Sequence, residues 1–407
     1  MPKLADYEPI VGSQVIEELS LLAERLRGKT VQNINSTSVG GGVAEILNRM
    51  IPLLHDLGVD ARWDLLKGGE AFFNVTKRIH NALHGAEVDL SQSEIETFLQ
   101  TNRENAGMIN WSGDIVFIHD PQPIALVEKR KEIGRNWVWR CHIDFSSPHP
   151  PVWEFLRGFI EQYDTAVFSA PAFARQLPIR QVLISPSIDP LSDKNRELSR
   201  EEILAVFEKL KIDPEKPTLT QISRFDYLKD PFGVINAYKQ VKRYIDCQLI
   251  LAGGGAVDDP EGNQVYQQVL ERAGNDPDIH VLLLPPSSDL EINALQRGST
   301  VILQKSLREG FGLTIAEALW KKKPVVASAV GGIPLQITHK YSGILTYTVE
   351  GTAFWLRQLL QSPEFAQKLG INGYHHIHQN FLITRHIKDY LLLFISLYHP
   401  GEEVVYL

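Results

Sequence analysis

The sequence predicts an α/β protein built from two doubly wound domains. Its 407 residues exceed what a single hydrophobic core usually serves. In each half of the chain, short apolar runs typical of strands alternate with helical patterns, which indicates a parallel sheet covered on both faces. A polar, turn-rich segment at residues 188–195 separates the two series, so we place the linker there.

The first series follows a polar, leucine-spaced segment at residues 1–29, which should be helical and end at Gly28. After the first strand, a loop that ends in Gly40-Gly41-Gly42 precedes an amphipathic helix at residues 43–57. The expected strands are residues 31–35, 61–66, 114–120, 138–144, 165–169 and 181–185.

The second series repeats this architecture without an alignable sequence repeat. Its expected strands are residues 218–223, 247–252, 279–284, 299–304, 324–329 and 343–347. We therefore expect a first domain at 1–190, joined by a C-terminal helix from about 384, and a second domain at 191–383. Since ligands bind at the carboxyl ends of parallel strands, two such domains facing each other would place an active-site cleft between them.

Composition and net charge indicate a soluble globular protein and argue against some classes of binding partner. Apolar residues make up 43% of the chain and charged residues 22%, as in soluble globular proteins. The net charge, 41 minus 49 or −8, argues against nucleic acid or an anionic membrane as the main partner. Two cysteines, Cys141 and Cys247, allow neither a disulfide framework nor a zinc cluster. With no signal pattern and no apolar run near the roughly 20 residues of a membrane span, a cytoplasmic location is expected.

The stretch from Ser306 to Leu319 carries two carboxylates eight residues apart. Glu309 stands in a predicted turn beside Gly310 and Gly312, where a ligand can approach the backbone, and Glu317 is expected about two turns into the following helix. Both could face one ligand across the helix N-terminus. Alternatively, Glu309 is an acidic residue of the kind favoured near a helix start, and Glu317 is an ordinary solvated residue. The stretch by itself does not distinguish a ligand site from these structural roles.

A basic loop follows the first strand of the second domain. It places Arg224 and Lys229 within six residues of each other, where ligands bind in such sheets. The planar fork of arginine and the point charge of lysine suit a diphosphate whose charge grows as a bond to it breaks. The alternative is a pair of solvated loop cations.

Two triple glycines follow strands. Gly40-Gly41-Gly42 offers backbone N–H groups just before a helix, an arrangement that fits a phosphate, although a tight turn is the competing interpretation. The spacing lacks the third glycine of the dinucleotide fingerprint, so an NAD site is not expected. Gly253-Gly254-Gly255 is either another close-approach site or a packing feature, and the sequence leaves both open.

Histidine and aspartate end two strands of the first domain, as His119-Asp120, followed by Gln122, and as His142 with Asp144. Side chains at these positions could bond sugar hydroxyls, whereas a lone histidine is more often structural. No nucleophile elbow occurs, which disfavours a Ser-His-Asp hydrolase.

Taken together, these segments resemble the retaining glycosyltransferases of family 4. Their Glu-x₇-Glu motif is matched by Glu309 and Glu317, and their upstream Arg and Lys by Arg224 and Lys229. More narrowly, the chain is similar to the trehalose glycosyltransferring synthases, and the trehalose phosphorylases share much of this frame. The matching segments are 35–45, 73–77, 119–123, 139–144 and 186–192.

The resemblance implies two facing Rossmann-like domains of the GT-B fold. It implies transfer of glucose from UDP- or ADP-glucose to glucose, giving α,α-trehalose with the donor's α configuration kept. Retention would follow a same-face route, in which the departing diphosphate oxygen takes the acceptor's proton, rather than a carboxylate nucleophile.

The resemblance also assigns residues. Glu317 would bind the donor ribose, Glu309 the glucosyl hydroxyls, and Arg224 with Lys229 the diphosphate, over which the loop at 40–42 would close. The catalytic set implied is Arg224, Lys229, Glu309 and His142, with Gly310, Phe311, Gly312 and Leu313 completing the donor site. Acceptor contacts are expected from His119, Asp120, Gln122 and Asp144.

No cofactor and no metal ligands are expected, and the partners are small-molecule substrates. The sequence leaves open a need for Mg²⁺, the preferred nucleotide and whether the chain forms a homodimer. Competing functions are a trehalose phosphorylase, in which phosphate replaces the nucleotide, a sugar-nucleotide epimerase of the same architecture, and a non-catalytic nucleotide-sugar sensor.

Overall fold

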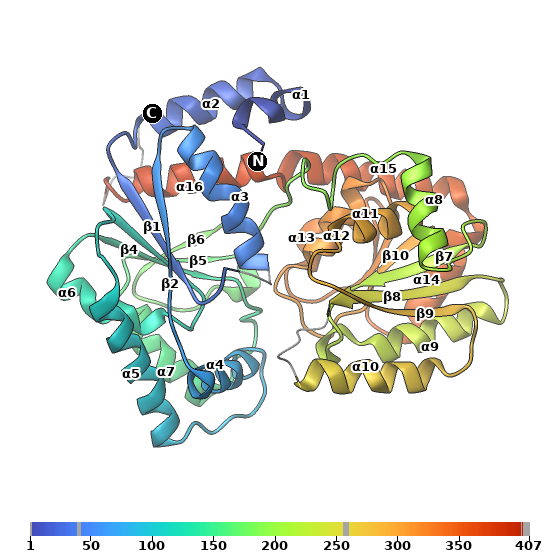
Figure 1. Cartoon of the computed structure of the whole chain (residues 1–407), viewed down its shortest axis with the longest axis horizontal. Helices are drawn as coiled ribbons and strands as arrows, with labels where there is room; N and C mark the ends of the chain where they lie inside the picture. Colours follow the sequence, from blue (N-terminus) through green and yellow to red (C-terminus); the bar gives the residue numbers. More distant parts are fainter. Residues whose placement is uncertain (1, 39–41, 255–259, 400, 402–407) are drawn as a thin grey trace. The chain divides into compact units, whose positions relative to one another are not determined.

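The computed structural model describes residues 2–38, 42–254, 260–399 and 401. The chain divides into two compact units, each described here by itself (Figure 1). Unit 1 comprises Met1–Ser187 and Ile383–Leu407, and unit 2 comprises Ile188–Leu382. Three candidate residues of the sequence analysis, Gly40, Gly41 and Gly255, lie outside the described residues.

Unit 1 contains a six-stranded parallel sheet in the order β2-β1-β3-β4-β5-β6. The inner strands are almost wholly buried, as expected when helices cover both faces, whereas the edge strands β2 and β6 are partly exposed. The strands are β1 (Thr30–Asn35), β2 (Asp60–Leu65), β3 (Ile115–His119), β4 (Asn136–Cys141), β5 (Thr165–Phe168) and β6 (Arg180–Leu183).

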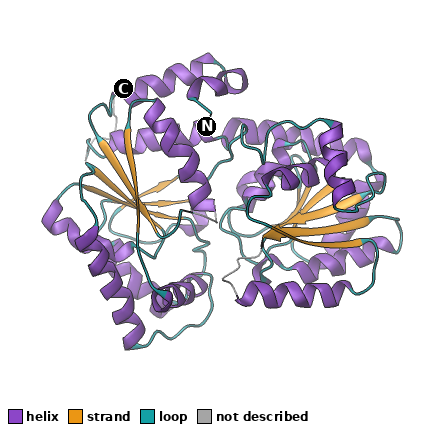
Figure 2. Ribbon diagram, viewed as in Figure 1, coloured by secondary structure: helices purple, strands orange, loops and turns teal. Residues whose placement is uncertain are grey.

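Helices flank both faces of this sheet (Figure 2). The C-terminal helix α16 packs against β3, where Phe117 meets the rings of Tyr390 and Phe394 edge-on. The helices are α1 (Glu8–Val11), α2 (Ser13–Glu24), α3 (Gly42–Asp56), α4 (Glu70–Leu83), α5 (Gln92–Met108), α6 (Arg130–Ile133), α7 (Pro150–Ile160) and α16 (Ile383–Ser396), with 3₁₀ turns η1 (Leu4–Tyr7), η2 (Ile124–Lys129) and η3 (Pro171–Phe173).

Unit 2 contains a second six-stranded parallel sheet, in the order β12-β11-β10-β7-β8-β9. Its strands are β7 (Thr218–Ile222), β8 (Gln248–Gly254), β9 (Ile279–Leu284), β10 (Val301–Gln304), β11 (Val325–Ser328) and β12 (Ile344–Thr346). Its helices are α8 (Arg200–Lys209), α9 (Pro231–Lys242), α10 (Pro260–Ala273), α11 (Asp289–Gly298), α12 (Leu313–Trp320), α13 (Ile333–Gln336), α14 (Val349–Gln361) and α15 (Pro363–Asn380), with the 3₁₀ turn η4 (Tyr227–Lys229).

Two apolar clusters hold the helices of unit 2 to its sheet. The larger cluster joins Leu219 and Leu303 of the strands to Tyr238 of α9, and it also includes residues of α14 and α15. The smaller cluster joins Ile250 of β8 to Phe207 of α8 and Leu295 of α11. Burial of such side chains is the main favourable contribution to folding, and two clusters are what a sheet covered on both faces requires.

Both sheets have a topological switch point. In unit 1 the chain runs from β1 out to β2 and then returns to β3 on the other side of β1. In unit 2 it runs from β7 through β8 to β9 and returns to β10 beside β7. Ligands of open parallel sheets bind where the strand order reverses, at the carboxyl ends of the two diverging strands.

The structure confirms the predicted fold class and all twelve strands, with two local corrections. β4 ends at Cys141, so His142 and Asp144 lie in the loop that follows and not within the strand. The expectation that Glu317 lies two turns into its helix is wrong, because α12 begins only at Leu313 and Glu317 is about one turn in. Gly312 adopts a left-handed conformation (φ 83°) that keeps residues 310–312 out of the helix.

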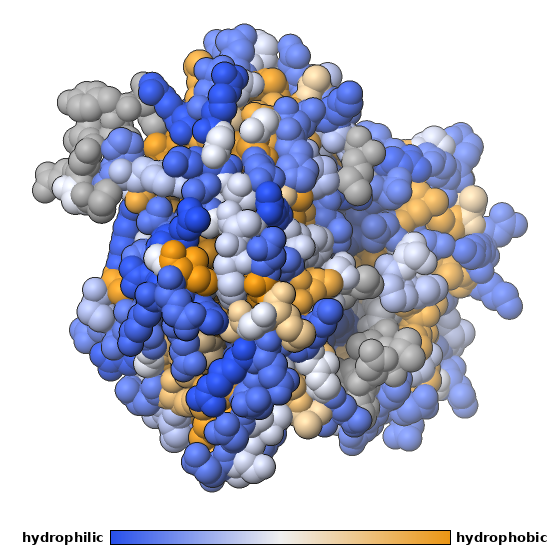
Figure 3. Space-filling view, turned by 60° about the vertical axis from the view of Figure 1, so that its left-hand side comes forward, coloured by the Kyte–Doolittle hydropathy of each residue, from blue (hydrophilic) through white to orange (hydrophobic). Residues whose placement is uncertain are grey.

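The face shown in Figure 3 is mostly hydrophilic, with hydrophobic residues in small separate patches, which is ordinary for a protein surface. Within the described part of the chain, no helix combines the length and apolarity needed to cross a membrane.

Candidate functional site

The first candidate site lies at the switch point of unit 2, where β7 and β10 end. A buried glutamine on β7, Gln221, ties the two following loops together. Its amide nitrogen donates to the carbonyl of Lys229 (2.9 Å), and its amide oxygen accepts from the backbone N–H of Lys305 (2.8 Å). The loops also meet directly, since the Leu307 N–H donates to the Leu228 carbonyl (2.7 Å). The basic loop and the glutamate loop are therefore fixed against each other.

Lys229 and Glu309 form a close ion pair, with Nζ 2.7 Å from Oε2. The Ser306 hydroxyl (2.9 Å) and the Gln304 amide (3.3 Å) donate to the same oxygen. Both side chains of the pair are largely buried, with 17% and 10% exposure. Such charge-assisted bonds in a shielded site hold the carboxylate in one orientation.

The turn that carries Glu309 is held from α13. The buried amide of Gln336 donates to the Phe311 carbonyl (2.5 Å), and the Gly332 N–H donates to the Glu309 carbonyl (3.3 Å). Gly332 has to be small, because a Cβ there would stand 2.6 Å from the Gly310 carbonyl oxygen. The backbone of the turn is thus fixed independently of the Glu309 side chain.

Glu317 is buried, with a side chain that is 3% exposed, so the alternative of a solvated helix residue is wrong. The Lys194 ammonium lies 3.9 Å from its carboxylate. The buried Lys321, one turn further on, donates to the Glu317 carbonyl and to two side-chain amides. Burial lowers the pKa of Lys321 to about 7, and the negative charge of Glu317 opposes that shift. A buried carboxylate between two lysines is a built feature rather than a surface charge.

Arg224 differs from Lys229. Its side chain is 57% exposed and contacts Asp226 at 3.3 Å. An exposed ion pair of this kind is worth little, so the guanidinium is able to turn toward an anionic ligand. Gly253 lies next to this loop, and a Cβ there would overlap the Ser223 carbonyl oxygen. The packing interpretation of this glycine therefore holds.

The second candidate site lies at the switch point of unit 1. Nδ1 of His119, at the end of β3, lies 3.2 Å from Nε2 of His142, and the two rings stack at 5.5 Å between centroids. The other ring nitrogen of His119 lies 3.1 Å from the side-chain oxygen of Asn33 on β1. Burial lowers the pKa of His119 to about 3 and holds that of His142 well below its usual range, and the Arg140 charge acts in the same direction. Both imidazoles are therefore neutral at pH 7.

Of the other three predicted acceptor residues, Asp120 contacts this histidine pair, while Asp144 and Gln122 form other contacts. Asp120 accepts a hydrogen bond from the backbone N–H of His142 (2.8 Å), and burial raises its pKa to about 6. Asp144 instead accepts from the N–H and hydroxyl of Ser146 (2.9 and 2.6 Å), which stabilises the loop after β4. The Gln122 carbonyl is held by Asn102 (3.1 Å). The structure thus brings His119, Asp120 and His142 together, whereas Asp144 shapes the adjoining loop.

Sequence comparison decides the family. The model described as trehalose synthase, N-terminal domain, matches residues 33–175, and that described as glycosyl transferases group 1 matches residues 202–376. The trehalose synthase of Pyrococcus horikoshii is 46% identical over 401 residues, which cover 97% of this chain and 96% of that protein. The chain belongs to the trehalose synthase family of glycosyltransferases. The trehalose synthase of Rubrobacter xylanophilus is 45% identical over 404 residues, covering 97% of each chain.

More distant relatives and solved structures are consistent with this family. The trehalose phosphorylase of Pleurotus pulmonarius is 31% identical over 399 residues, which cover 84% of this chain and 54% of that protein. Among solved structures, sucrose-phosphate synthase from Thermosynechococcus elongatus superposes with a TM-score of 0.72 at 15% identity over 92% of this chain and all of that one. The trehalose-6-phosphate synthase OtsA gives 0.72 at 14% identity over 92% and 99%. These neighbours show the GT-B fold.

Membership of the trehalose synthase family confirms the resemblance that the sequence motifs indicated. The chain is therefore a glycosyltransferase, and its reaction is related to trehalose. Among the described residues, no group of three or more His, Cys, Asp or Glu side chains is placed to hold a metal ion.

Sequence reasoning missed the residues that support both sites. Gln221, Gln304 and Asn33 are buried polar side chains in the central strands β7, β10 and β1. A polar residue in an otherwise apolar central strand is costly unless it is bonded, and that signal could have identified them. Gln336 carries no such signal, because it lies on a four-residue helix far along the chain.

Proposed function

We propose that this protein transfers glucose from a nucleoside diphosphate glucose to free glucose and forms α,α-trehalose with retention of the donor's α configuration. The observation that carries the proposal is the Lys229–Glu309 pair at the β7/β10 switch point, in a chain 46% identical over nearly its whole length to trehalose synthases. A related fold, the trehalose-6-phosphate synthase of E. coli, has been solved with UDP-2-fluoro glucose, which supports a nucleotide-sugar donor.

In this proposal unit 2 holds the donor. Lys229 has three donor hydrogens and uses one on Glu309, which leaves others for the diphosphate. Arg224 would turn from Asp226 to the same diphosphate, and the backbone of residues 310–313 would line the site. Glu317 would accept hydrogen bonds from the ribose. These cations would stabilise the charge that builds on the leaving group as the glycosidic bond breaks.

Glu309 would orient the glucosyl group rather than attack it. Three donors converge on its Oε2, and each lowers the nucleophilicity of the carboxylate. Its Oε1 would accept from glucosyl hydroxyls. The bond between C1 and the diphosphate oxygen breaks, a bond from C1 to the acceptor oxygen forms on the same face, and the acceptor's proton passes to the leaving diphosphate.

Unit 1 would hold the acceptor. In the neutral pair, His119 Nε2 donates to Asn33 and His119 Nδ1 accepts from His142 Nε2, so His142 Nδ1 offers an uncharged acceptor position. Such a position suits a hydroxyl of free glucose better than a phosphate. His142 would lie beside the transferred glucose, and Asp120, Gln122 and Asp144 would supply further acceptor contacts. The loop at residues 40–42, of which Gly40 and Gly41 lie outside the described residues, would contribute backbone N–H groups to the diphosphate.

The rival function, phosphorolysis of trehalose, has the 31% identity to a trehalose phosphorylase in its favour. Against it stands Glu317, because a buried carboxylate is suited to ribose hydroxyls and would repel inorganic phosphate.

One experiment separates the two functions. The protein is incubated with glucose and with UDP-glucose, ADP-glucose or glucose 1-phosphate, and a non-reducing disaccharide is sought by chromatography after borohydride reduction. We expect product from a nucleoside diphosphate glucose, and far slower product formation by the Lys229→Ala variant. Product from glucose 1-phosphate alone would overturn the proposal.

A further inference from the structure

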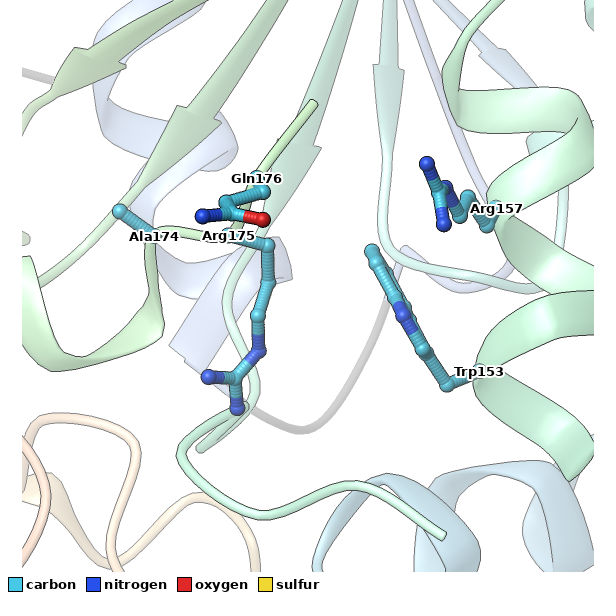
Figure 4. A pocket seen from close by; sticks show the side chains of 5 residues that line it. All are labelled: Trp153, Arg157, Ala174, Arg175 and Gln176. Atoms are coloured by element: carbon cyan, nitrogen blue, oxygen red, sulfur yellow. The ribbon is translucent and has the colours of Figure 1, made fainter. Parts of the chain in front are cut away.

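Unit 1 contains a cavity of about 530 Å³ outside the histidine pair, lined by Trp153, Arg157, Ala174, Arg175 and Gln176. Trp153 and Arg157 stand on α7, which follows β4, and the other three residues follow η3, after β5. In Figure 4 the indole of Trp153 and the Arg157 side chain face Arg175 and Gln176 across the open space. The cavity therefore lies among the loops at the carboxyl ends of the strands, the edge of the sheet where ligands bind.

Carboxylates offset the charges of the two arginines that line the cavity. Arg157 donates to Glu161, the residue that follows α7 (2.6 Å), and lies 3.8 Å from Glu154. Arg175 interacts with the Asp144 carboxylate, which opposes the effect of burial on its pKa. Two cations thus face three carboxylates, so the cavity presents N–H donors without a net positive charge. An anionic ligand would gain little here, whereas hydroxyl oxygens could accept from the guanidinium groups.

An aromatic wall is held in a defined position. The Trp153 ring packs edge-on against Phe145, at 5.1 Å and 77°. Arg175 covers the Phe145 ring at 5.7 Å and donates to the Phe145 carbonyl. Gln181 fixes the Arg175 backbone through two bonds, of 3.0 and 2.6 Å. An immobilised indole facing a ring of hydrogen-bond donors suits the C–H face and hydroxyls of a pyranose.

We propose that this cavity binds a neutral saccharide, glucose or trehalose, at a site separate from the one that holds the reacting acceptor. Its volume falls within the usual range for small-molecule sites, roughly 300–1,000 Å³. The choice of sugar rests on the proposed function, but the site itself rests on the cavity, its charge balance and the indole. Since Trp153 and Arg175 both contact Phe145, which follows Asp144, an occupant braces the loop after β4.

The test uses the full chain labelled with 5-fluorotryptophan and ¹⁹F NMR, with the Trp153 signal assigned by its loss in Trp153→Phe. Trehalose, glucose and inorganic phosphate are titrated separately. We expect a saturable shift of the Trp153 signal with either sugar and none with phosphate. A shift caused by phosphate, or no shift with either sugar, overturns the proposal.

Matched variants localise the binding. Arg157→Gln should weaken the sugar affinity about tenfold, close to 1.4 kcal/mol, with kcat at saturating glucose unchanged. Arg103→Gln is the control, because Arg103 is also a helix arginine near two glutamates and is similarly exposed. Equal effects of the two variants overturn the assignment to this cavity, and thermal unfolding of each verifies folding.

The titration is repeated in His142→Ala and in Lys229→Ala. The Trp153 shift should persist in both, since neither residue lines the cavity. Loss of the shift in His142→Ala would assign the signal to the acceptor site instead and overturn the proposal. Binding in the cavity needs no turnover, so the two proposals can fail separately. A Trp153 shift without trehalose formation would contradict only the proposed function. Trehalose formation without a Trp153 shift would contradict only the saccharide site.

Discussion

Both switch points lie between diverging parallel strands, but they differ in electrostatics. At the β7/β10 point, charged pairs dominate, namely Lys229 with Glu309, Lys305 with Asp230 and Lys194 with Glu317. At the β1/β3 point, two neutral imidazoles stack and an aspartate has a raised pKa. The same sheet edge thus carries paired charges in one unit and uncharged imidazoles in the other, which is consistent with the proposed donor and acceptor roles.

A buried arginine accounts for part of this difference. Arg140 on β4 is inaccessible to solvent, and it contacts the Ser169 hydroxyl at 3.4 Å and lies 5.9 Å from the Tyr390 ring centroid. Burial is the main cause of the lowered pKa values of His119 and His142, and the positive charge of Arg140 is the second cause. A permanent buried cation therefore keeps the imidazoles of unit 1 uncharged, whereas in unit 2 the lysines are neutralised pairwise by carboxylates.

The largest effect should come from breaking the charged site. Lys229→Ala removes both the partner of Glu309 and the cation assigned to the leaving group, and kcat should fall about 10²- to 10³-fold. Steady-state kinetics with saturating donor measures this. Lys209→Ala, which removes an exposed lysine paired with Glu291, is the control. An unchanged kcat with only a higher donor KM would refute the leaving-group role.

The neutral site should respond through the acceptor. His142→Ala removes one member of the stacked pair and leaves His119 Nδ1 without its bond, so kcat/KM for glucose should fall about 10- to 100-fold, the effect of losing about 1–3 kcal/mol of hydrogen bonding. The Kd for UDP, which lacks the glucosyl group, should stay the same when measured by calorimetry. A weaker affinity for UDP would contradict the proposed division of roles between the two sites.

The sequence specifies much of this arrangement but not its supporting contacts. Alternation of apolar runs located every strand, and the spacing of Glu309 from Glu317 together with Lys229 identified the charged site. The stacking of His119 on His142 depends on β3 lying beside β4, a neighbour relation that hydrophobic periodicity does not encode. The anchoring of the Glu309 turn by Gln336 is a tertiary contact across 25 residues with no local signal.

A smaller effect is expected from Glu317→Gln. This isosteric change keeps the packing of α12 but weakens acceptance from ribose hydroxyls, so the donor KM should rise about tenfold with little change in kcat. Binding of UDP by calorimetry measures the same loss without turnover. If UDP affinity does not change, the ribose assignment is wrong, and Glu317 serves only to balance Lys194 and Lys321.

The smallest effect concerns stability, and it has opposite signs for two groups of the neutral site. Asp120 has a folded pKa of about 6, above its ordinary 3.8, so the unfolded chain binds fewer protons between these values and stability falls as pH rises through that window. His119 has the opposite effect. Its folded pKa is about 3, below the ordinary 6.5, so its contribution lowers the stability of the protein as pH falls below 6.5.

Asp120→Asn separates these contributions. The amide oxygen can still accept from the His142 N–H, while the desolvated charge is gone, so the Tm should exceed that of the parent at pH 7. The difference should close toward pH 4, where the parent carboxyl is protonated, and both proteins should still lose stability in acid because the histidines must charge. Calorimetric scans from pH 4 to 8 follow the difference. If the Tm difference between variant and parent does not change with pH, Asp120 does not titrate in this range. The carboxyl of Asp120 would then make no pH-dependent contribution to stability.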